Sequence, residues 1–213
     1  MRVRKFTQNG ININKLKERL NVSATNRGTN RKAYDFYATP IDVVLNFLEQ
    51  QTIEKLKQNG GVILEPSAGN GNIIKALNTY YKDRNKTIEA CEIRTEEEFG
   101  LKEISDEVII GDFLELDINK KYDVIIGNPP YSLAKEFVEK SLSCLKDDGV
   151  LIFLLRTAFL ESKSRYEFWQ KNPLSGLYTL SKRPSFTGKG TDATSYSWFV
   201  WDKGSDKQTI KVI

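Results

Sequence analysis

Four consecutive residues, Asn128, Pro129, Pro130 and Tyr131, combine hydrogen-bond acceptors with an aromatic ring at the end of an apolar run. Each proline fixes its own φ angle and restricts the residue before it, so the Asn128 side chain and the Pro129 carbonyl are held in place. These two acceptors can take both hydrogens of an exocyclic amine, while Tyr131 stacks on the ring that carries the amine. The pattern favours a site for a flat, amine-bearing base, although a rigid exit from a strand could have the same sequence.

A glycine-rich loop lies earlier in the chain, between a short apolar run and a helical pattern. Its sequence is Glu65-Pro66-Ser67-Ala68-Gly69-Asn70-Gly71. Glycines allow a ligand to approach the backbone closely, and doubly wound sheets bind their ligands at the carboxyl ends of the strands. The dinucleotide fingerprint G-x-G-x-x-G is not matched, because Ile74 occupies the last glycine position, and no G-x-x-x-x-G-K-[ST] motif is present. We therefore do not expect a cofactor held through its phosphates.

Two carboxylates end the next two predicted strands. Glu92, beside Ile93, ends the second strand, where an acidic side chain can accept from both ribose hydroxyls of an adenosine cofactor. Asp112 ends the third strand, where it can accept from an adenine amine while Phe113 covers the base. Each carboxylate alone would more often be a solvated strand end. Their order before Asn128 favours an adenosine-containing cofactor.

Strand and helix patterns alternate from about residue 60 onward, and these elements must position the motifs. Apolar runs predict strands over residues 61–65, 88–93, 108–113, 122–127 and 149–155, and helical spacing predicts helices over 70–81 and 133–145. Near-continuous apolar strands are typical of parallel sheets covered on both faces. We predict an α/β fold with a Rossmann-like doubly wound sheet, mostly parallel, and a late edge or antiparallel strand over residues 195–201.

Charge divides the chain into three parts. Residues 1–33 carry a net charge of +8, residues 34–155 carry −9 and residues 156–213 carry +5, within a total of +4. This pattern is expected if the basic ends follow a phosphate backbone and the acidic centre binds a cationic or neutral small molecule. Ordinary solvated faces could also produce it. We predict a basic N-terminal arm or linker over residues 1–33 and one folded domain over residues 34–213.

The composition argues against several classes of protein. The 213 residues include no histidine, which removes Ser-His and Cys-His activation of a nucleophile and the commonest metal ligand. Cys91 and Cys144 form no C-x-x-C pair, and neither follows a proline, so we expect core cysteines, no metal site and no Pro-Cys nucleophile for cytosine-carbon methylation. No apolar stretch is long enough for a membrane span, and the N-terminus lacks a signal-peptide core, so we expect a cytoplasmic protein.

From about residue 34 to the C-terminus, the motifs together resemble the class I S-adenosylmethionine-dependent methyltransferases, and within them the adenine amino-methyltransferases. The resemblance implies S-adenosylmethionine as cofactor, S-adenosylhomocysteine as product and the exocyclic amine of adenine in DNA as methyl acceptor. It places loop 65–71 around the methionine end of the cofactor, Glu92 at the ribose and Asp112-Phe113 at the adenine. The segment 34–40, which contains Tyr37, Thr39 and Pro40, would close over the methionine carboxylate.

The C-terminal third resembles short phage and prophage DNA adenine methyltransferases through residues 154–161, 183–186 and 198–204. In a duplex the target base must be flipped out, where Tyr131 would stack on one face and Phe186 could fill the other. Only a short helix separates Tyr131 from the next strand, so we expect no separate target-recognition domain there. The arm 1–33, Lys189 in the loop 187–191, or a partner subunit could supply phosphate contacts.

Three other functions remain compatible with the sequence. Methylation of adenine in RNA would use the same residues. Methylation of a glutamine amide in a protein also uses an Asn-Pro-Pro-Tyr site, although the basic flanks argue for a nucleic acid. The chain could also be a non-catalytic accessory subunit that binds cofactor or nucleic acid, against which the intact tetrapeptide and the complete glycine loop argue.

Overall fold

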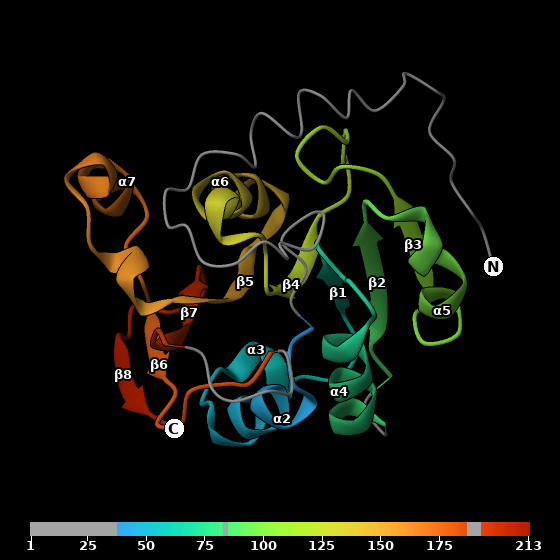
Figure 1. Cartoon of the computed structure of the whole chain (residues 1–213), viewed down its shortest axis with the longest axis horizontal. Coiled ribbons are helices and arrows are strands. Elements are labelled where there is room, and N and C mark those ends of the chain that lie inside the picture. The colour runs from blue at the N-terminus through green and yellow to red at the C-terminus, as the bar shows by residue number, and fades with distance from the viewer. Residues whose placement is uncertain (1–37, 83–84, 187–192) are drawn as a thin grey trace.

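A computed structural model describes residues 38–82, 85–186 and 193–213. Its strands are β1 (Val62–Glu65), β2 (Thr87–Glu92), β3 (Glu107–Ile110), β4 (Tyr122–Gly127), β5 (Leu145–Arg156), β6 (Gly176–Thr179), β7 (Tyr196–Asp202) and β8 (Thr209–Val212). They form one eight-stranded sheet through the middle of the molecule, in the order β3-β2-β1-β4-β5-β7-β6-β8 (Figure 1).

The direction of the strands agrees with the predicted doubly wound sheet. The five strands β3, β2, β1, β4 and β5 pair in parallel with their neighbours. In contrast, β7 runs antiparallel to both β5 and β6. The late antiparallel strand is therefore confirmed. It is not an edge strand, because β6 and β8 extend the sheet beyond it. These two strands have four residues each, too few to show a clear alternation in the sequence.

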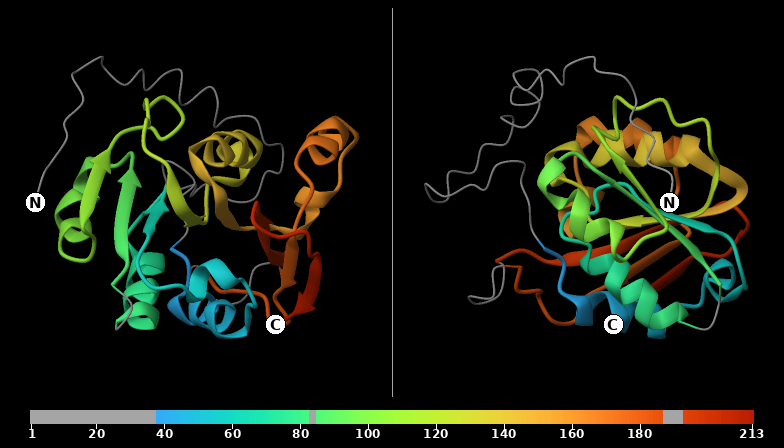
Figure 2. Two further views of the ribbon diagram at one scale, coloured as in Figure 1. Left: turned by 180° about the vertical axis from the view of Figure 1, so that it is seen from behind. Right: turned by 90° about the vertical axis from the view of Figure 1, so that its right-hand side faces the viewer.

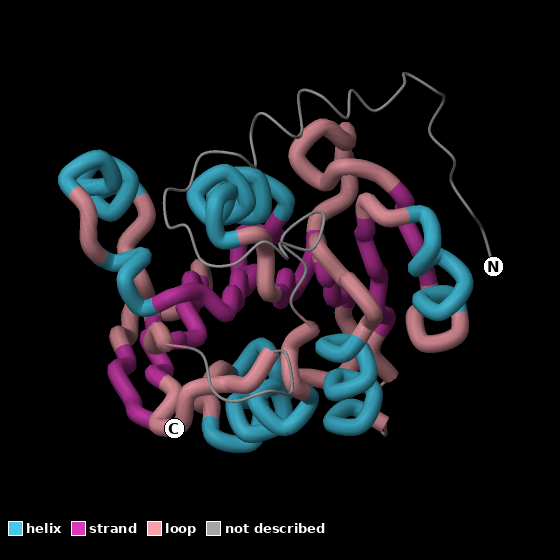
Figure 3. The backbone as a smooth tube through the Cα atoms, in the orientation of Figure 1, coloured by secondary structure: helices cyan, strands magenta, loops and turns pink. Residues whose placement is uncertain are grey.

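Helices cover both faces of the sheet. They are α2 (Ile41–Gln50), α3 (Glu54–Lys57), α4 (Asn72–Tyr81), α5 (Glu98–Lys102), α6 (Ala134–Cys144) and α7 (Tyr166–Lys171). Figures 1 and 3 show α2, α3 and α4 on one face, α6 and α7 on the other, and α5 beside the β3 edge. The view from the side in Figure 2 shows the same layers. A parallel sheet covered in this way buries both its faces, which explains the near-continuous apolar strands.

Two hydrophobic cores result, one on each face of the sheet. In β4, Val124 and Ile126 belong to the core under α2 and α4, whereas Ile125 belongs to the core under α6. In β5, Ile152 and Phe153 divide between the cores in the same way. Successive side chains of a strand point to opposite faces, so a strand that is apolar at every position can fill two cores at once.

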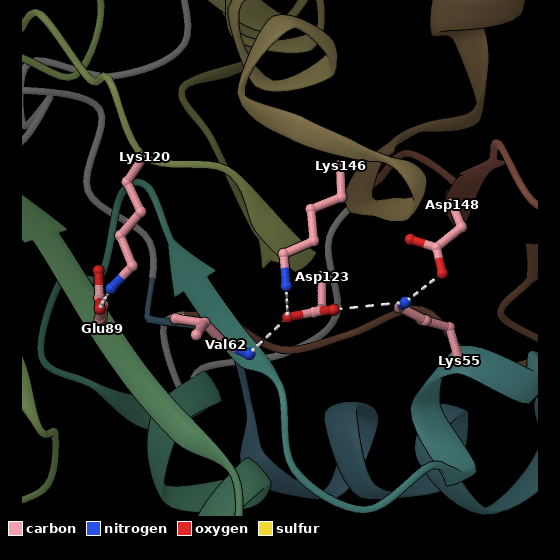
Figure 4. Close-up of polar contacts among 7 residues, drawn as sticks. All are labelled: Lys55, Val62, Glu89, Lys120, Asp123, Lys146 and Asp148. Carbon is pink, nitrogen blue, oxygen red and sulfur yellow. Dashed lines mark hydrogen bonds and ion pairs between the residues drawn. The ribbon is translucent and has the colours of Figure 1, made fainter.

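Polar side chains join the amino ends of β1 and β4 to β5 and α3 (Figure 4). Asp123 accepts hydrogen bonds from the Val62 backbone nitrogen at 2.9 Å and from Lys146 Nζ at 2.8 Å. Lys55 lies 3.3 Å from Asp123 and 2.6 Å from Asp148. Burial raises the pKa of Asp123, but the hydrogen bonds from Lys146, Val62 and Lys55 outweigh it and bring that pKa to about 2. This network lies at the amino ends of β1 and β4, whereas the predicted site lies at the carboxyl ends of the strands. We therefore assign it a structural role.

Both cysteines, Cys91 and Cys144, are buried and form no disulfide, which confirms the prediction of core cysteines. In the part of the chain that the structure describes, no helix has both the length and the apolar character needed to cross a membrane. Those same residues contain no group of three or more His, Cys, Asp or Glu side chains that could hold a metal ion.

Candidate active site

One cavity opens at the carboxyl ends of β1, β2 and β4 and at the turn after β3. Most residues predicted to bind a cofactor line it: Thr39, residues 65–69, Glu92, Ile93, Asp112, Phe113 and Asn128. Pro130 also lines the cavity, whereas Pro40, Gly71, Pro129, Tyr131 and Phe186 do not. Tyr37 and Lys189 lie outside the described residues. Residues from five separate segments of the sequence thus meet here, four of them at or after the ends of parallel strands and one, residues 38–39, before α2.

The glycine loop is fixed by hydrogen bonds to the end of β2. Ala68 donates its backbone N–H to the carbonyl of Cys91 at 2.9 Å, and Gly69 donates to Oε2 of Glu92 at 2.6 Å. Gly71 has a φ of +76°, and a Cβ atom there would lie 2.3 Å from Cδ1 of Ile104. The positive φ favours glycine at position 71, where the chain turns into α4, and a contact of Gly71 with cofactor stays a prediction.

Glu92 is buried, and the protein uses both of its carboxylate oxygens. Besides the bond from Gly69, its Oε1 accepts from the backbone nitrogen and from Nε of Arg94, each at 3.0 Å. Arg94 also pairs with Glu97 at 3.0 Å and lines the cavity. Oε2 accepts the bond from Gly69 and can accept a further one, and contact with ribose hydroxyls stays a prediction.

Glu65 ends β1 and is buried, with only 2% of its surface exposed. Its Oε2 has no hydrogen-bond partner among the described residues. Burial, and after it the negative charge of Glu92, raises the pKa of Glu65 well above its usual range. A buried carboxylate oxygen without a partner favours a ligand that carries a positive charge or donates hydrogen bonds.

The turn after β3 carries Asp112 and Phe113. The strand itself ends at Ile110, so the prediction of a strand as far as residue 113 was too long. The chain turns there because Oδ1 of Asp112 accepts from the Leu114 backbone nitrogen at 2.9 Å. Phe113 is buried and stacks on Phe137 of α6, with ring centroids 5.4 Å apart. One apolar ring and one carboxylate therefore lie side by side on the cavity wall.

Asn128 follows β4 directly, at the point where the strand reaches the cavity. Its Nδ2 donates to Oγ1 of Thr39 at 3.0 Å. Its Oδ1 is buried and has no partner among the residues that the structure describes. After Pro130 the chain enters a short 3₁₀ turn, Tyr131–Leu133, which leads into α6. The amide oxygen is thus available to accept from a ligand.

Tyr131 lies next to the cavity lining rather than in it. Its ring centroid is 5.6 Å from that of Tyr196 and 5.1 Å from the guanidinium carbon of Arg156. The Tyr196 ring in turn packs edge-on to Phe186, with centroids 5.0 Å apart. Burial raises the pKa of Tyr131 well above its usual range. Tyr131 and Phe186 are therefore connected through Tyr196, which the sequence analysis did not single out.

Sequence reasoning also missed Arg94, Asn72 and Arg156. Arg94 and Asn72 each lie one or two residues beyond a motif, and no rule of spacing marks them. Arg156 has a visible signal, because it is a charged residue directly after the longest apolar run. That position places it at the carboxyl edge of the sheet, beside Tyr131.

Comparison with known proteins supports a single class. No protein-family model matches the chain. The Type II methyltransferase M.CvrRI of Paramecium bursaria Chlorella virus XZ-6E is 31% identical over 121 residues, which cover 47% of this chain and 31% of that protein. The match thus spans about a third of the length of this relative.

Two solved structures share the fold. One, from Listeria monocytogenes and assigned to the class I S-adenosylmethionine-dependent methyltransferases, gives a TM-score of 0.66 at 15% identity, over 86% of this chain and 68% of the other. The methyltransferase subunit of a type I restriction-modification system from Streptococcus thermophilus gives 0.66 at 15%, over 85% and 48%. The fold is therefore that of the class I S-adenosylmethionine-dependent methyltransferases, and part of the chain is related in sequence to a viral type II methyltransferase.

The cavity suits the cofactor that this fold implies. The methionine end of S-adenosylmethionine carries an ammonium group, which matches the unpaired, buried carboxylate oxygen of Glu65. The adenine end presents an amine and a flat ring, which match Asp112 and Phe113. The charge and hydrogen-bonding groups of these side chains thus match those of the cofactor, and the role of each residue stays a prediction.

Proposed function

We propose that this protein transfers a methyl group from S-adenosylmethionine to the exocyclic amine of adenine in DNA. The observation that carries the proposal is the environment of Asn128. This residue lines the cavity, has an amide oxygen with no partner among the described residues, and precedes two prolines that restrict the backbone. An acceptor held in this way is what a primary amine attached to a ring requires.

The chain's own residues favour the reactive form of the amine. An adenine amine is a weak nucleophile because its lone pair is delocalised into the ring. Acceptors at Asn128 Oδ1 and at the Pro129 carbonyl stabilise a tetrahedral nitrogen, whose lone pair is free to attack. When bound, S-adenosylmethionine supplies an activated methyl group and a good leaving group. The protein therefore has to align and desolvate rather than form a covalent bond, and this is consistent with a chain that has no histidine.

Aromatic and basic groups near Asn128 support a base flipped from a nucleic acid as the substrate. We assign Tyr131 to stacking on the base, and the exposed Arg156 lies against its ring. Phe186 packs against Tyr196, which in turn packs against Tyr131. The positive net charge of residues 156–213 suits a phosphate backbone, and residues 1–33, which lie outside the described ranges, are assigned here to a basic arm.

Two relatives support DNA as the polymer. The viral relative is a type II methyltransferase, and one structural neighbour is a subunit of a type I restriction-modification system. Because that neighbour is one subunit of a larger system, we include in the proposal a partner subunit that supplies target recognition. Adenine as the target rests on the Asn-Pro-Pro-Tyr sequence and on the acceptors that it provides.

The experiment that tests this function is transfer of labelled methyl from S-adenosylmethionine to duplex DNA, single-stranded DNA, RNA and protein extract. The matched control is Asn128→Ala, with cofactor binding measured by calorimetry for both proteins. Label in DNA from the wild type alone supports the proposal. Label in RNA or in protein would replace DNA by that substrate class. Cofactor binding without transfer to any substrate would instead identify an accessory subunit.

A further inference from the structure

Thr39 connects three parts of the candidate site. It lies two residues before α2, and only 5% of its surface is exposed. Its Oγ1 accepts the hydrogen bond from Asn128 Nδ2 at 3.0 Å, and its carbonyl accepts from Nδ2 of Asn72, the first residue of α4, at 3.0 Å. Thr39 itself lines the cavity. The segment before α2 is thereby joined both to the glycine-loop side of the site and to the residue assigned to catalysis.

The contact matters because an asparagine amide has two unlike ends. Its oxygen accepts hydrogen bonds and its nitrogen donates them, and a half-turn about χ2 exchanges the two. If the nitrogen of Asn128 met the amine of the substrate, two donors would face each other and the attacking nitrogen would lose an acceptor. In the structure Thr39 Oγ1 accepts from the Nδ2 end, and Oδ1 is the end that has no partner among the described residues.

We propose that Thr39 is a positioning residue that holds the Asn128 amide with its oxygen toward the methyl acceptor. This role rests on the function proposed for Asn128. Asn72 supports it by binding the Thr39 carbonyl, which limits movement of the segment. The sequence predicts only a cofactor contact for Thr39, and such a contact would affect cofactor affinity. A positioning role affects turnover instead, so the two roles are separable by experiment.

Three variants test the proposal by kinetics. Thr39→Val keeps the shape of the side chain but removes the hydroxyl, and Thr39→Ser keeps the hydroxyl. Thr79→Val is the matched control, because Thr79 lies exposed on α4 and its hydroxyl donates to the carbonyl of Lys75 in the same helix. We expect Thr39→Val to lower the single-turnover rate by about ten- to a hundredfold with the Kd for S-adenosylmethionine changed less than about threefold. Thr39→Ser should stay within about threefold of the wild type in both.

A second measurement does not depend on turnover. The side-chain NH₂ resonances of Asn128 can be assigned in a ¹⁵N spectrum through their loss in Asn128→Ala. We expect these resonances to shift in Thr39→Val and to stay in place in Thr39→Ser and Thr79→Val. Unshifted resonances in Thr39→Val would overturn the proposal, as would a rate loss matched by an equal loss of cofactor affinity. If the wild type methylates nothing, the proposed function fails, while the NMR spectra still decide whether Thr39 holds the amide.

Discussion

The carboxylates of Glu65 and Glu92 are buried at the ends of neighbouring parallel strands and line the same cavity, but only one of them is satisfied by the protein. Glu92 accepts from Gly69 and Arg94, whereas Oε2 of Glu65 has no partner among the described residues. Burial first, and then the charge of Glu92, raises the pKa of Glu65. The site is therefore arranged for a positively charged ligand at the cost of stability without one.

Glu65→Gln should separate these two effects. Since the folded-state pKa of Glu65 is raised, its carboxylate destabilises the fold increasingly as pH rises from about 4.3, the ordinary value, through the folded-state pKa. We expect the variant to melt at a higher temperature than the wild type without cofactor, with a larger gain at pH 8 than at pH 5. It should also bind S-adenosylmethionine about tenfold more weakly. Thermal unfolding at the two pH values measures the change in stability, and calorimetry measures the cofactor affinity. A melting temperature of Glu65→Gln equal to or lower than that of the wild type would contradict the account.

Asp123→Asn should destabilise the fold without affecting the cavity. The pKa of Asp123 is about 2 in the folded protein, against about 3.9 when unfolded, so its contribution, between about 2 and 3 kcal/mol, is present above pH 4 and is lost as pH falls through 2. Urea unfolding should show that Asp123→Asn has a lower free energy of unfolding than the wild type by this amount at pH 7, and by a much smaller amount at pH 2.5. Asp148→Asn is the control, since Asp148 shares Lys55 but is exposed. A control variant as unstable as Asp123→Asn would argue against the network as described.

Tyr131 gives a prediction about substrate binding. Tyr131→Phe removes only the hydroxyl and keeps the ring that we assign to stacking, so this variant should retain nearly normal activity. Tyr131→Ala removes the ring and should raise the KM for DNA by about ten- to a hundredfold, because stacking of a base on an aromatic ring is worth about 1–3 kcal/mol. Steady-state kinetics with both variants measure this. If Tyr131→Phe raised the KM for DNA as much as Tyr131→Ala does, the hydroxyl rather than the ring would be the group that matters.

The basic arm predicts a dependence on salt. Residues 1–33 carry a net charge of +8, and each phosphate that a protein neutralises on duplex DNA adds about 0.9 to the slope of log K against log salt concentration. We expect steep dependence for the full chain and a flatter one for residues 34–213. Binding titrations at several salt concentrations compare the two proteins. An unchanged slope would remove the arm from the interface.

Much of this architecture could be predicted from the sequence, because the signals are local. Residues 122–127 form the predicted strand β4, and the predicted helix over 70–81 forms as α4 from Asn72. The cavity could be anticipated because strand ends in a parallel sheet share one edge. What could not be predicted is contact between distant segments, such as Thr39 with Asn128 or Tyr196 with Tyr131. These pairs depend on how the sheet and α2 pack, and no pattern in the sequence records it.

The central claim is that Asn128 directs methyl transfer to an adenine amine. The most direct test is mass spectrometry of nucleosides from DNA treated with S-adenosylmethionine and either the wild type or Asn128→Ala, with the Kd for the cofactor measured in parallel. We predict N6-methyldeoxyadenosine from the wild type, a loss of at least about a hundredfold in the variant, and cofactor affinity within about threefold. Methylation at another atom, or an Asn128→Ala variant as active as the wild type, would contradict the account.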